Sequence, residues 1–497
     1  MNLFDFNGGV HPPQHKDDST RRAIASLPLV RHYAVALQQH AGAAAFPVVS
    51  VGQRVLKGET IAIAREAVSA AVHAPTSGVV RAIEPHPLPH PAGLADPCIV
   101  IESDGEDRWI ARQPFDFEAA GRDATLAYIR QSGIVGLGGA AFPSAVKLGA
   151  GRRQSVPTLI VNGAECEPWI TCDDMLMRER AAAVLRGAQL MAQLLESREI
   201  IVGIEENKDL ASEALAQAAR DYDNVTVIRV PTIYPMGGAK QLIKVLTGKE
   251  TPSGGRSTDI GVACFNVGTA YAVARAIDHG EPLISRIVTV TGNVRRPQNF
   301  EALIGTPMQD VIAASGAPLD DTDGYLIGGP MMGFKLGSTT APLTKSVNCV
   351  IATSPALFPP APPALPCIRC TRCASACPAD LQPQELYWFA RGQRLDKAET
   401  YGIFDCIECG CCAYVCPSHI PLVDYYRWLK SEIQAGRAEK SAADAARERH
   451  ELHLARLERE QREKAERHAQ RIAAAQQQAA ATPGPEAARA TPADTAN

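Results

Sequence analysis

The sequence of 497 residues has little net charge, few aromatic residues and no long apolar run. Its 50 Lys and Arg nearly balance its 54 Asp and Glu, and no basic stripe with interleaved aromatics occurs, which argues against nucleic acid as a partner. No apolar run reaches the roughly 18 residues that a membrane helix needs. The first residues, MNLFDFNGGVHPPQHKDD, lack the basic and apolar regions of a secretory signal. We therefore expect a protein with no secretory signal and no transmembrane segment of its own.

Cysteine, by contrast, is clustered near the C-terminal end in two runs of the form Cys-x-x-Cys-x-x-Cys-x-x-x-Cys-Pro. This is the spacing of bacterial ferredoxins, in which three thiolates of one run hold a 4Fe–4S cluster and the fourth reaches the other cluster. Zinc sites and disulfides are the alternatives, but zinc is usually held by two separated cysteine pairs. If the fourth cysteine of each run binds the cluster of the other run, which we call the crossed arrangement, one cluster lies on Cys367, Cys370, Cys373 and Cys416. The second then lies on Cys406, Cys409, Cys412 and Cys377.

The remaining six cysteines stand outside these runs, and we expect each to be a small buried hydrophobe. With eight of 14 cysteines assigned to metal, the composition is typical of a reducing, cytosolic compartment rather than of a disulfide-linked secreted protein.

Residues 41–105 indicate short β-strands joined by turns, with Gly52, Gly58 and Gly78 at the predicted hairpin positions. The segments VGQRVLKGETIA and HAPTSGVV resemble the barrel-sandwich hybrid of biotinyl and lipoyl domains. The expected carrier hairpin, AREAVSAAVHAP, has no lysine, so a swinging-arm role is not expected.

From residue 123 onward, apolar strands alternate with amphipathic helices, which predicts parallel βαβ units in a doubly wound α/β layer. A strand at 157–163 precedes a long helix at 178–197, and residues 286–316 indicate a β-grasp-like hairpin, turn and helix. The tail beyond the cysteines is charged and Ala-rich, typical of a solvated helix that ends in disorder. The predicted domains are a barrel-sandwich-like domain (1–122), a nucleotide-binding α/β domain (123–284), a β-grasp module (285–350), a Pro-rich linker (351–366), a two-cluster ferredoxin module (367–432) and the tail (433–497).

Two glycine- and acid-containing segments are candidates for nucleotide binding. GLGGAAFPSAVKL (136–148) can bring backbone N–H groups and Lys147 to an anion, although a plain glycine-rich turn is an equal alternative. VNGAECEPW (161–169) follows a predicted strand, where open α/β sheets bind ligands, but its acids could equally be solvated loop residues. The iron–sulfur module needs an electron source, and a flavin converts hydride transfer into single-electron steps, which favours the nucleotide interpretation.

Taken together and in this order, eight segments resemble the RnfC family, a component of the Rnf (Rsx) ion-translocating electron-transport complex, over about residues 1–430. They are GGVHPP (8–13), VHAPTSG (72–78), GLGGAAFPSAVK (136–147), NGAECEP (162–168), YPMGGAKQLI (234–243), NVGTAYA (266–272), IGGPMMG (327–333) and the paired cysteine runs. The middle region is similar to the flavoprotein subunit of complex I, which binds FMN and NADH, and residues 286–335 look like the family's soluble-ligand-binding β-grasp domain.

The resemblance implies a set of FMN- and NADH-contacting residues. The glycine loop would hold the flavin, Phe142 would stack on the nicotinamide nucleotide, and Glu167 would lie on the NADH side. The implied residues are Gly136, Gly138, Phe142, Lys147, Asn162, Glu165, Glu167, Tyr234, Gly237, Asn266 and Thr269. No side chain is implied as a general acid or base.

At four positions the chain departs from the complex I pattern. Paired glutamates after the third glycine loop are replaced by Gly238 and Ala239, a second stacking aromatic by Ala150, and the first acid of the flavin-edge motif by Ala164. The first three bear on NADH and the last on flavin.

The resemblance implies a peripheral subunit at the cytoplasmic face of the bacterial inner membrane, an NADH-linked oxidoreductase within a translocase. It would exchange electrons with NADH through FMN and pass them through two 4Fe–4S clusters to or from membrane subunits of the same complex. A soluble reductase of the same family, for example of cobalamin, is one alternative. A ferredoxin-type electron-transfer scaffold that binds no nucleotide is another.

Overall fold

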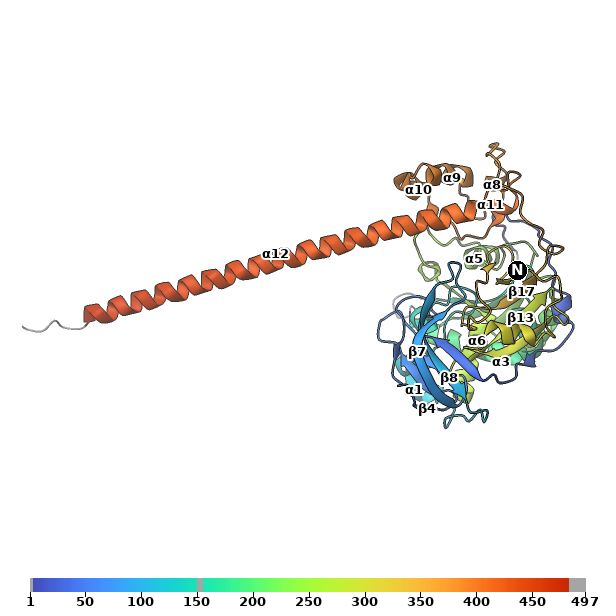
Figure 1. Ribbon diagram of the computed structural model, residues 1–497, viewed down its shortest axis with the longest axis horizontal. Coiled ribbons are helices and arrows are strands. Elements are labelled where there is room, and N and C mark those ends of the chain that lie inside the picture. Colours follow the sequence, from blue (N-terminus) through green and yellow to red (C-terminus); the bar gives the residue numbers. More distant parts are fainter. Residues whose placement is uncertain (1–2, 150–154, 482–497) are drawn as a thin grey trace, which may run out of the picture. The chain divides into compact units, whose positions relative to one another are not determined.

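The computed structural model describes residues 3–149 and 155–481. The chain divides into two compact units, Met1–Trp428 and Leu429–Asn497, which are described separately (Figure 1). Within the described residues, no helix has both the length and the apolarity needed to cross a membrane.

The N-terminal β-domain consists of two antiparallel sheets, drawn in blue in Figure 1. Val35, Ile61 and Ile99 are fully buried between them, which confirms the predicted barrel-sandwich architecture. One sheet has the order β2-β8-β7-β4 and the other β3-β5-β6, with bounds β2 His32–Ala36, β3 Phe46–Pro47, β4 Arg54–Val55, β5 Thr60–Ile63, β6 Val72–His73, β7 Gly78–Pro87 and β8 Ala95–Ser103.

Three glycines of this domain have two different roles. Gly52 and Gly58 lie in turns with φ of 88° and 81°, as predicted. Gly78 instead begins strand β7, where a Cβ would lie 2.1 Å from the carbonyl oxygen of Glu102. The prediction of a hairpin turn at Gly78 was therefore wrong, because this glycine allows a close approach of two strands.

The central domain is built on a parallel sheet with the order β11-β10-β9-β12, buried on both faces. Alternate residues of β9 point to opposite faces: Leu159 and Val161 pack in the core that contains α3 and α6, whereas Ile160 packs with α5. This confirms the doubly wound layer. The elements are α1 Phe117–Gln131, α2 Ser144–Leu148, β9 Thr158–Gly163, α3 Cys172–Leu195, β10 Glu199–Glu205, α4 Asp209–Ala218, β11 Val225–Val230, α5 Ala239–Thr247, β12 Val262–Asn266 and α6 Val267–His279.

Helix α3 begins six residues before the predicted start at Arg178. The carboxylate of Glu165 accepts hydrogen bonds from the backbone N–H groups of Asp173 and Asp174 at 2.7 and 3.2 Å. A side chain from outside the helix thus satisfies the first-turn donors, and no local pattern indicates it.

The β-grasp module is a six-stranded sheet with the order β1-β14-β13-β17-β15-β16 and helix α7. Its first strand comes from the N-terminal segment, since Ala25 pairs in parallel with Phe300. Strand β17 lies inside the sheet, so its residues beyond 350 are not linker. The bounds are β1 Ala25–Ser26, β13 Ser285–Gly292, β14 Gln298–Leu303, α7 Met308–Ala313, β15 Gly324–Ile327, β16 Phe334–Lys335 and β17 Cys349–Thr353.

The N-terminal segment also contacts other modules before it reaches the β-domain. Val10 and Tyr234 exchange backbone hydrogen bonds of 2.8 and 2.9 Å, and the Gly9 N–H donates to the carbonyl of Ala376 at 3.1 Å. The first residues of the predicted domain 1–122 therefore contact the central domain, the β-grasp module and the cysteine module. The predicted end of this domain, at residue 122, falls inside α1.

The two runs of the cysteine module have the same backbone conformation at equivalent positions. Each run carries a short helix that begins one residue before its third cysteine, and positive φ angles recur at Arg369 and Glu408, at Thr371 and Gly410, and at Asp380 and His419. Its helices are α8 Arg372–Ser375, α9 Pro383–Arg391, α10 Leu395–Thr400, α11 Cys411–Tyr414 and the start of α12 Leu422–Ala481. The tail is helical to Ala481, as predicted, and the predicted disorder of residues 482–497 falls outside the described residues.

Candidate functional site

Three predicted contact residues meet at the carboxyl edge of the parallel sheet. Asn162 is the penultimate residue of β9, and its side chain donates to the Gly237 carbonyl at 2.9 Å and accepts from the Ala164 N–H at 3.1 Å. Asn266 ends β12 and caps α6, because its side-chain oxygen accepts from the Gly268 N–H at 2.8 Å. Both asparagines thereby fix the loops that surround this edge, the place where open α/β sheets bind ligands.

The glycine loop lies against Asn266. The Leu137 N–H donates to the hydroxyl of buried Thr269 at 2.9 Å, so Thr269 holds the loop. A Cβ on Gly138 would lie 3.1 Å from the Asn266 Cβ, whereas one on Gly139 would meet nothing within 4 Å. The structure thus brings the loop, Asn266 and Thr269 together and leaves open backbone at Gly139, which suits a bound phosphate.

Three more residues of the predicted set lie in or beside this loop. Gly136 closes it, with its N–H 2.8 Å from the Phe142 carbonyl, and the Phe142 side chain is exposed. Lys147 is half-buried, with its ammonium group donating to the Cys264 carbonyl and lying 4.4 Å from the centre of the Phe265 ring. Burial lowers the pKa of Lys147. Ala150 lies outside the described residues.

Glu165 lies beside an acid that the sequence did not single out. Asp173, at the start of α3, accepts from the Asn266 side-chain amide at 2.6 Å, and burial together with Glu165 raises the pKa of Asp173 to about 7. The only sequence signal for Asp173 is its place in the first turn of a helix, where acids are common. Asp173 connects two predicted flavin-contacting residues, Glu165 and Asn266.

Glu167 and Tyr234 extend this edge toward the cysteine module. The Glu167 carboxylate accepts from the N–H groups of Met331 and Met332 at 2.7 and 3.0 Å, and burial raises the pKa of Glu167. The Tyr234 hydroxyl donates to the Cys409 carbonyl at 2.6 Å, inside a buried contact. The predicted flavin edge, the β-grasp module and the second cysteine run therefore meet at one place.

The eight cysteines surround two cavities in the crossed arrangement. All 14 cysteines are within the described residues, and all are free thiols. We call the two sets the inner set, in contact with the central domain, and the outer set. The inner cavity is lined by Cys377, Cys406, Cys409 and Cys412, and the outer one by Cys367, Cys370, Cys373 and Cys416.

The donors of these cavities fit 4Fe–4S clusters. Each cavity offers four thiols and is otherwise lined mainly by apolar side chains. At equivalent positions, the N–H of Arg369 donates to the Cys367 sulfur and that of Glu408 to the Cys406 sulfur, both at 3.4 Å. The positive φ of both donor residues turns these N–H groups toward sulfur, and such hydrogen bonds tune cluster potentials.

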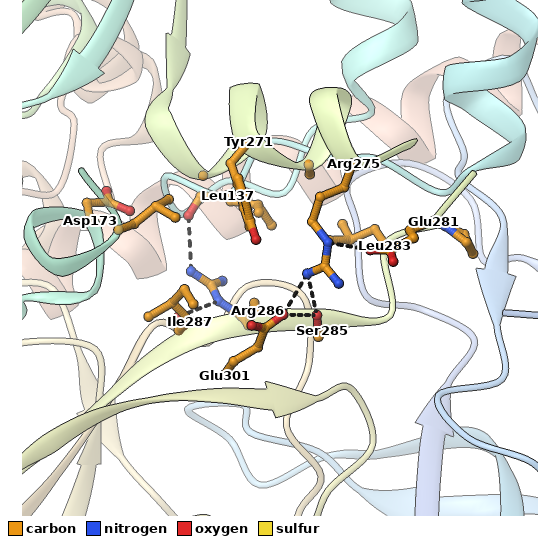
Figure 2. A pocket seen from close by; sticks show the side chains of 14 residues that line it. Leu137, Asp173, Tyr271, Arg275, Glu281, Leu283, Ser285, Arg286, Ile287 and Glu301 are labelled. Carbon is orange, nitrogen blue, oxygen red and sulfur yellow. Dashed lines mark hydrogen bonds and ion pairs between the residues drawn. The ribbon is translucent and has the colours of Figure 1, made fainter. Parts of the chain in front are cut away.

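A polar cluster joins the central domain to the β-grasp module (Figure 2). The Arg275 guanidinium donates to Glu301 at 2.6 Å and to the Ser285 hydroxyl at 3.1 Å, and Arg180 pairs with Glu301 at 2.8 Å. Arg286 donates to the Leu137 carbonyl at 3.4 Å, as the dashed line in Figure 2 shows. The base of the glycine loop is therefore fixed from the β-grasp side.

Two buried lysines lie behind the edge of the sheet, and sequence reasoning missed both. Lys208 pairs with buried Glu205 at 2.6 Å and donates to the Ala164 carbonyl at 2.9 Å. Lys16, from the N-terminal segment, donates to three carbonyls of the same loop. Neither lysine occurs in a recognisable motif.

Comparison with protein families gives four matches along the chain, each to a described domain. Residues 4–106 match the RnfC barrel sandwich hybrid domain, 129–275 the Nuo51 FMN-binding domain, 287–335 the SLBB domain and 366–420 the 4Fe-4S dicluster domain. These matches confirm the predicted fold classes and the predicted cofactor classes, FMN and paired 4Fe–4S clusters. They argue against a scaffold without nucleotide.

Two solved structures of NAD+-reducing NiFe hydrogenase are also similar. In the air-oxidized state the similarity has a TM-score of 0.40 at 22% identity, covering 57% of this chain and 54% of that chain. In the H2-reduced state the similarity has a TM-score of 0.41 at 21% identity, covering 64% of this chain and 62% of that chain.

Curated relatives named as the C component of an ion-translocating oxidoreductase complex match most of the chain. The protein of Salmonella paratyphi C is 48% identical over 456 residues, which are 91% of this chain and 64% of that protein. The protein of Salmonella arizonae is 47% identical over 456 residues, 91% of this chain and 68% of that protein. This chain thus spans roughly two thirds of the length of these relatives. At this identity and coverage, the chain belongs to the RnfC family of ion-translocating oxidoreductase complexes.

Proposed function

We propose that this chain is a peripheral electron-transfer subunit of an ion-translocating oxidoreductase complex, at the cytoplasmic face of the bacterial inner membrane. It exchanges electrons with NADH through FMN and relays them by two 4Fe–4S clusters to or from integral membrane subunits. The observation that carries this proposal is the direct contact of the predicted flavin edge with the inner cysteine set through Tyr234 and Cys409.

The residues that would hold FMN are those gathered at the carboxyl edge of the sheet. The glycine loop, with Gly136 and Gly138, would take the phosphate, while Asn162, Glu165 and Asn266 would line the ring. Bound FMN supplies the conversion between two-electron hydride chemistry and single-electron transfer. The chain contributes orientation, a fixed electrostatic environment and exclusion of water.

The residues that would hold the clusters differ in exposure between the two sets. In the inner set, Cys377, Cys409 and Cys412 are each 8% exposed or less. In the outer set, Cys370 is exposed. The inner set therefore suits exchange with the flavin site, and the outer set suits exchange with a partner protein.

At the positions where NADH is expected to bind, the residues of this chain differ from those of the complex I flavoprotein. Gly238 and Ala239 stand where a glutamate pair is expected, and a Cβ on Gly238 would lie 2.4 Å from the Gln241 side-chain oxygen. Phe142 and Glu167 remain as the candidate contacts with the dinucleotide. We therefore expect NADH to be bound mainly by stacking and by the glycine loop backbone.

Metal and flavin analysis of anaerobically reconstituted protein tests this proposal. We expect about eight iron atoms and one FMN per chain, and a Cys409→Ser variant should lose about half the iron. Because Cys409 belongs to the inner set, this variant should keep NADH-dependent flavin reduction but lose electron transfer to an external acceptor. Loss of flavin reduction in a correctly folded Cys409→Ser variant would contradict the proposed order of carriers.

A further inference from the structure

The N-terminal segment packs against the loop of residues 164–171, which carries Glu165 and Glu167. Lys16 extends its side chain into this loop, and its ammonium group donates to the carbonyls of Glu165 and Glu167, both at 2.8 Å, and of Ile170 at 2.6 Å. An ammonium group has three N–H donors, and all three are used here.

These three acceptors define the protonation state of Lys16. A neutral amine has only two N–H donors, so one buried carbonyl would lose its partner if Lys16 were deprotonated. Lys16 is 8% exposed. Burial and then the charge of Lys208 lower the pKa of Lys16, while Glu165 and Glu205 act in the opposite direction. The contacts therefore require a charged lysine inside the protein.

Neighbours of Lys16 attach to the same loop. The Trp169 N–H donates to the Gln14 carbonyl at 2.8 Å, and the His15 ring stacks on the Trp169 ring with centres 4.3 Å apart. The hydroxyls of Ser19 and Thr171 lie 2.9 Å apart. Lys16 is thus the centre of a continuous contact between residues 14–19 and the loop.

The loop needs support from outside because its backbone is strained. Glu165 has a φ of 43° and Trp169 a φ of 71°, left-handed conformations that cost free energy for residues other than glycine. Such conformations persist only where the surroundings over-determine them. The three Lys16 hydrogen bonds fix the carbonyls of Glu165, Glu167 and Ile170, which span both strained residues.

We propose that Lys16 is the positioning residue of the predicted flavin site: its ammonium group holds the strained loop so that Glu165 and Glu167 face the cofactor. This inference rests on the proposed function, since it assumes that the loop borders FMN. It assigns the N-terminal segment, which precedes the β-domain, to the flavin site. All three N–H donors of Lys16 are taken by carbonyls of the loop, so Lys16 acts through the loop.

The test compares Lys16→Met with Lys345→Met in the full-length chain. Methionine keeps the length and bulk of lysine but offers no donor. Lys345 is the matched control because it is also buried and donates only to backbone carbonyls, those of Ala71 at 3.0 Å and Gly133 at 2.7 Å, away from the loop. We measure FMN affinity by quenching of flavin fluorescence, hydrogen exchange of residues 164–171, and iron content.

For Lys16→Met we expect FMN affinity to fall by about tenfold or more, with faster exchange in residues 164–171 and wild-type iron content. For Lys345→Met we expect wild-type FMN affinity and wild-type exchange in that loop. Unchanged FMN affinity in Lys16→Met overturns the inference, even if exchange in the loop becomes faster, because the role would then be structural only. Equal losses in both variants also overturn it.

If Lys16→Met does not fold, Lys16→Gln replaces it, since an amide keeps two N–H donors. We expect an intermediate loss of FMN affinity, and wild-type affinity would overturn the inference. If the wild-type chain itself binds no FMN, the proposed function fails. Exchange in residues 164–171 still reports whether Lys16 holds the loop.

Discussion

The hydroxyl of Tyr234 donates a 2.6 Å hydrogen bond to the backbone carbonyl of Cys409, 175 residues further along the chain. Tyr234 is 1% exposed, so this contact is shielded from water. It joins the loop after β11, at the predicted flavin edge, to the middle of the second cysteine run. The distance from the flavin site to the inner cysteine set is therefore fixed by a specific contact.

Replacing Tyr234 by Phe should remove this hydrogen bond while keeping the aromatic ring of a predicted contact residue, because the hydroxyl is engaged with Cys409. The Cys409 carbonyl would lose a buried partner, which we expect to cost about 1–3 kcal/mol of unfolding free energy. Stopped-flow spectroscopy should show NADH-dependent flavin reduction at the wild-type rate, followed by slower cluster reduction.

Tyr128→Phe is the control for this experiment. The Tyr128 hydroxyl donates to the Ala276 carbonyl at 3.1 Å and joins α1 to α6, on a part of the central domain that contacts no cysteine of the two sets. Its loss should lower stability while cluster reduction stays fast. Slower cluster reduction in both variants would show that stability, rather than the Tyr234 contact, sets the rate.

The crossed arrangement predicts different losses for the two distal cysteines. Cys377→Ser should remove the inner cluster, although Cys377 belongs to the first run, and Cys416→Ser should remove the outer one. Electron paramagnetic resonance of the reduced protein should show that Cys377→Ser and Cys409→Ser lose the same signal. If Cys377→Ser instead lost the signal that Cys370→Ser loses, the ligand sets would not be crossed.

Asn266→Ala should weaken both α6 and FMN binding. The side chain caps the helix and also donates to Asp173, and loss of such a cap costs about 1 kcal/mol. Asp116→Ala removes a comparable cap from α1, where the side chain accepts from the Ala119 N–H at 3.0 Å. Urea unfolding should show similar losses for both variants, but only Asn266→Ala should weaken FMN binding in a fluorescence titration.

Lys345 should make stability depend on pH above neutrality. Burial lowers its pKa to about 7 in the folded chain, against 10.5 for a free lysine. Between these values the unfolded chain binds the extra proton, so the unfolding free energy should rise with pH, by up to about 1.4 kcal/mol per pH unit. Below pH 7 both states are protonated and this dependence should vanish.

Urea unfolding of the wild-type chain and of Lys345→Met from pH 6 to pH 10 measures this contribution, because other titrating groups are common to both. The difference between the two curves should be flat below about pH 7 and should slope above it. A constant difference across the whole range would mean that Lys345 keeps its proton when buried.

The features that could be predicted from the sequence are those fixed by residues that lie close together along the chain. Cysteine spacing predicts both cavities because three thiols of each set come from one short loop. Short, nearly continuous apolar runs predict β9 and β10, because both faces of these central strands are buried. These features depend on neighbours within a few residues.

The missed residues depend on contacts between distant segments. Lys16 meets carbonyls about 150 positions away, and in the sequence it is one lysine in a polar stretch. Strand β1 has two residues and no apolar alternation, and its partner is β14. No local pattern could distinguish either from a surface loop. The predicted domain limits at 122 and 350 fail for the same reason, since α1 and β17 cross them.

The most direct test of electron entry at the central domain and relay through the cysteine module is an anaerobic NADH titration of the reconstituted full-length protein. Visible absorbance follows the flavin, and electron paramagnetic resonance follows both clusters. Electron relay along the chain predicts that flavin absorbance bleaches and that electrons from NADH then appear on the clusters. Zinc in place of iron, or clusters that stay oxidised while the flavin is fully reduced by NADH, would contradict it.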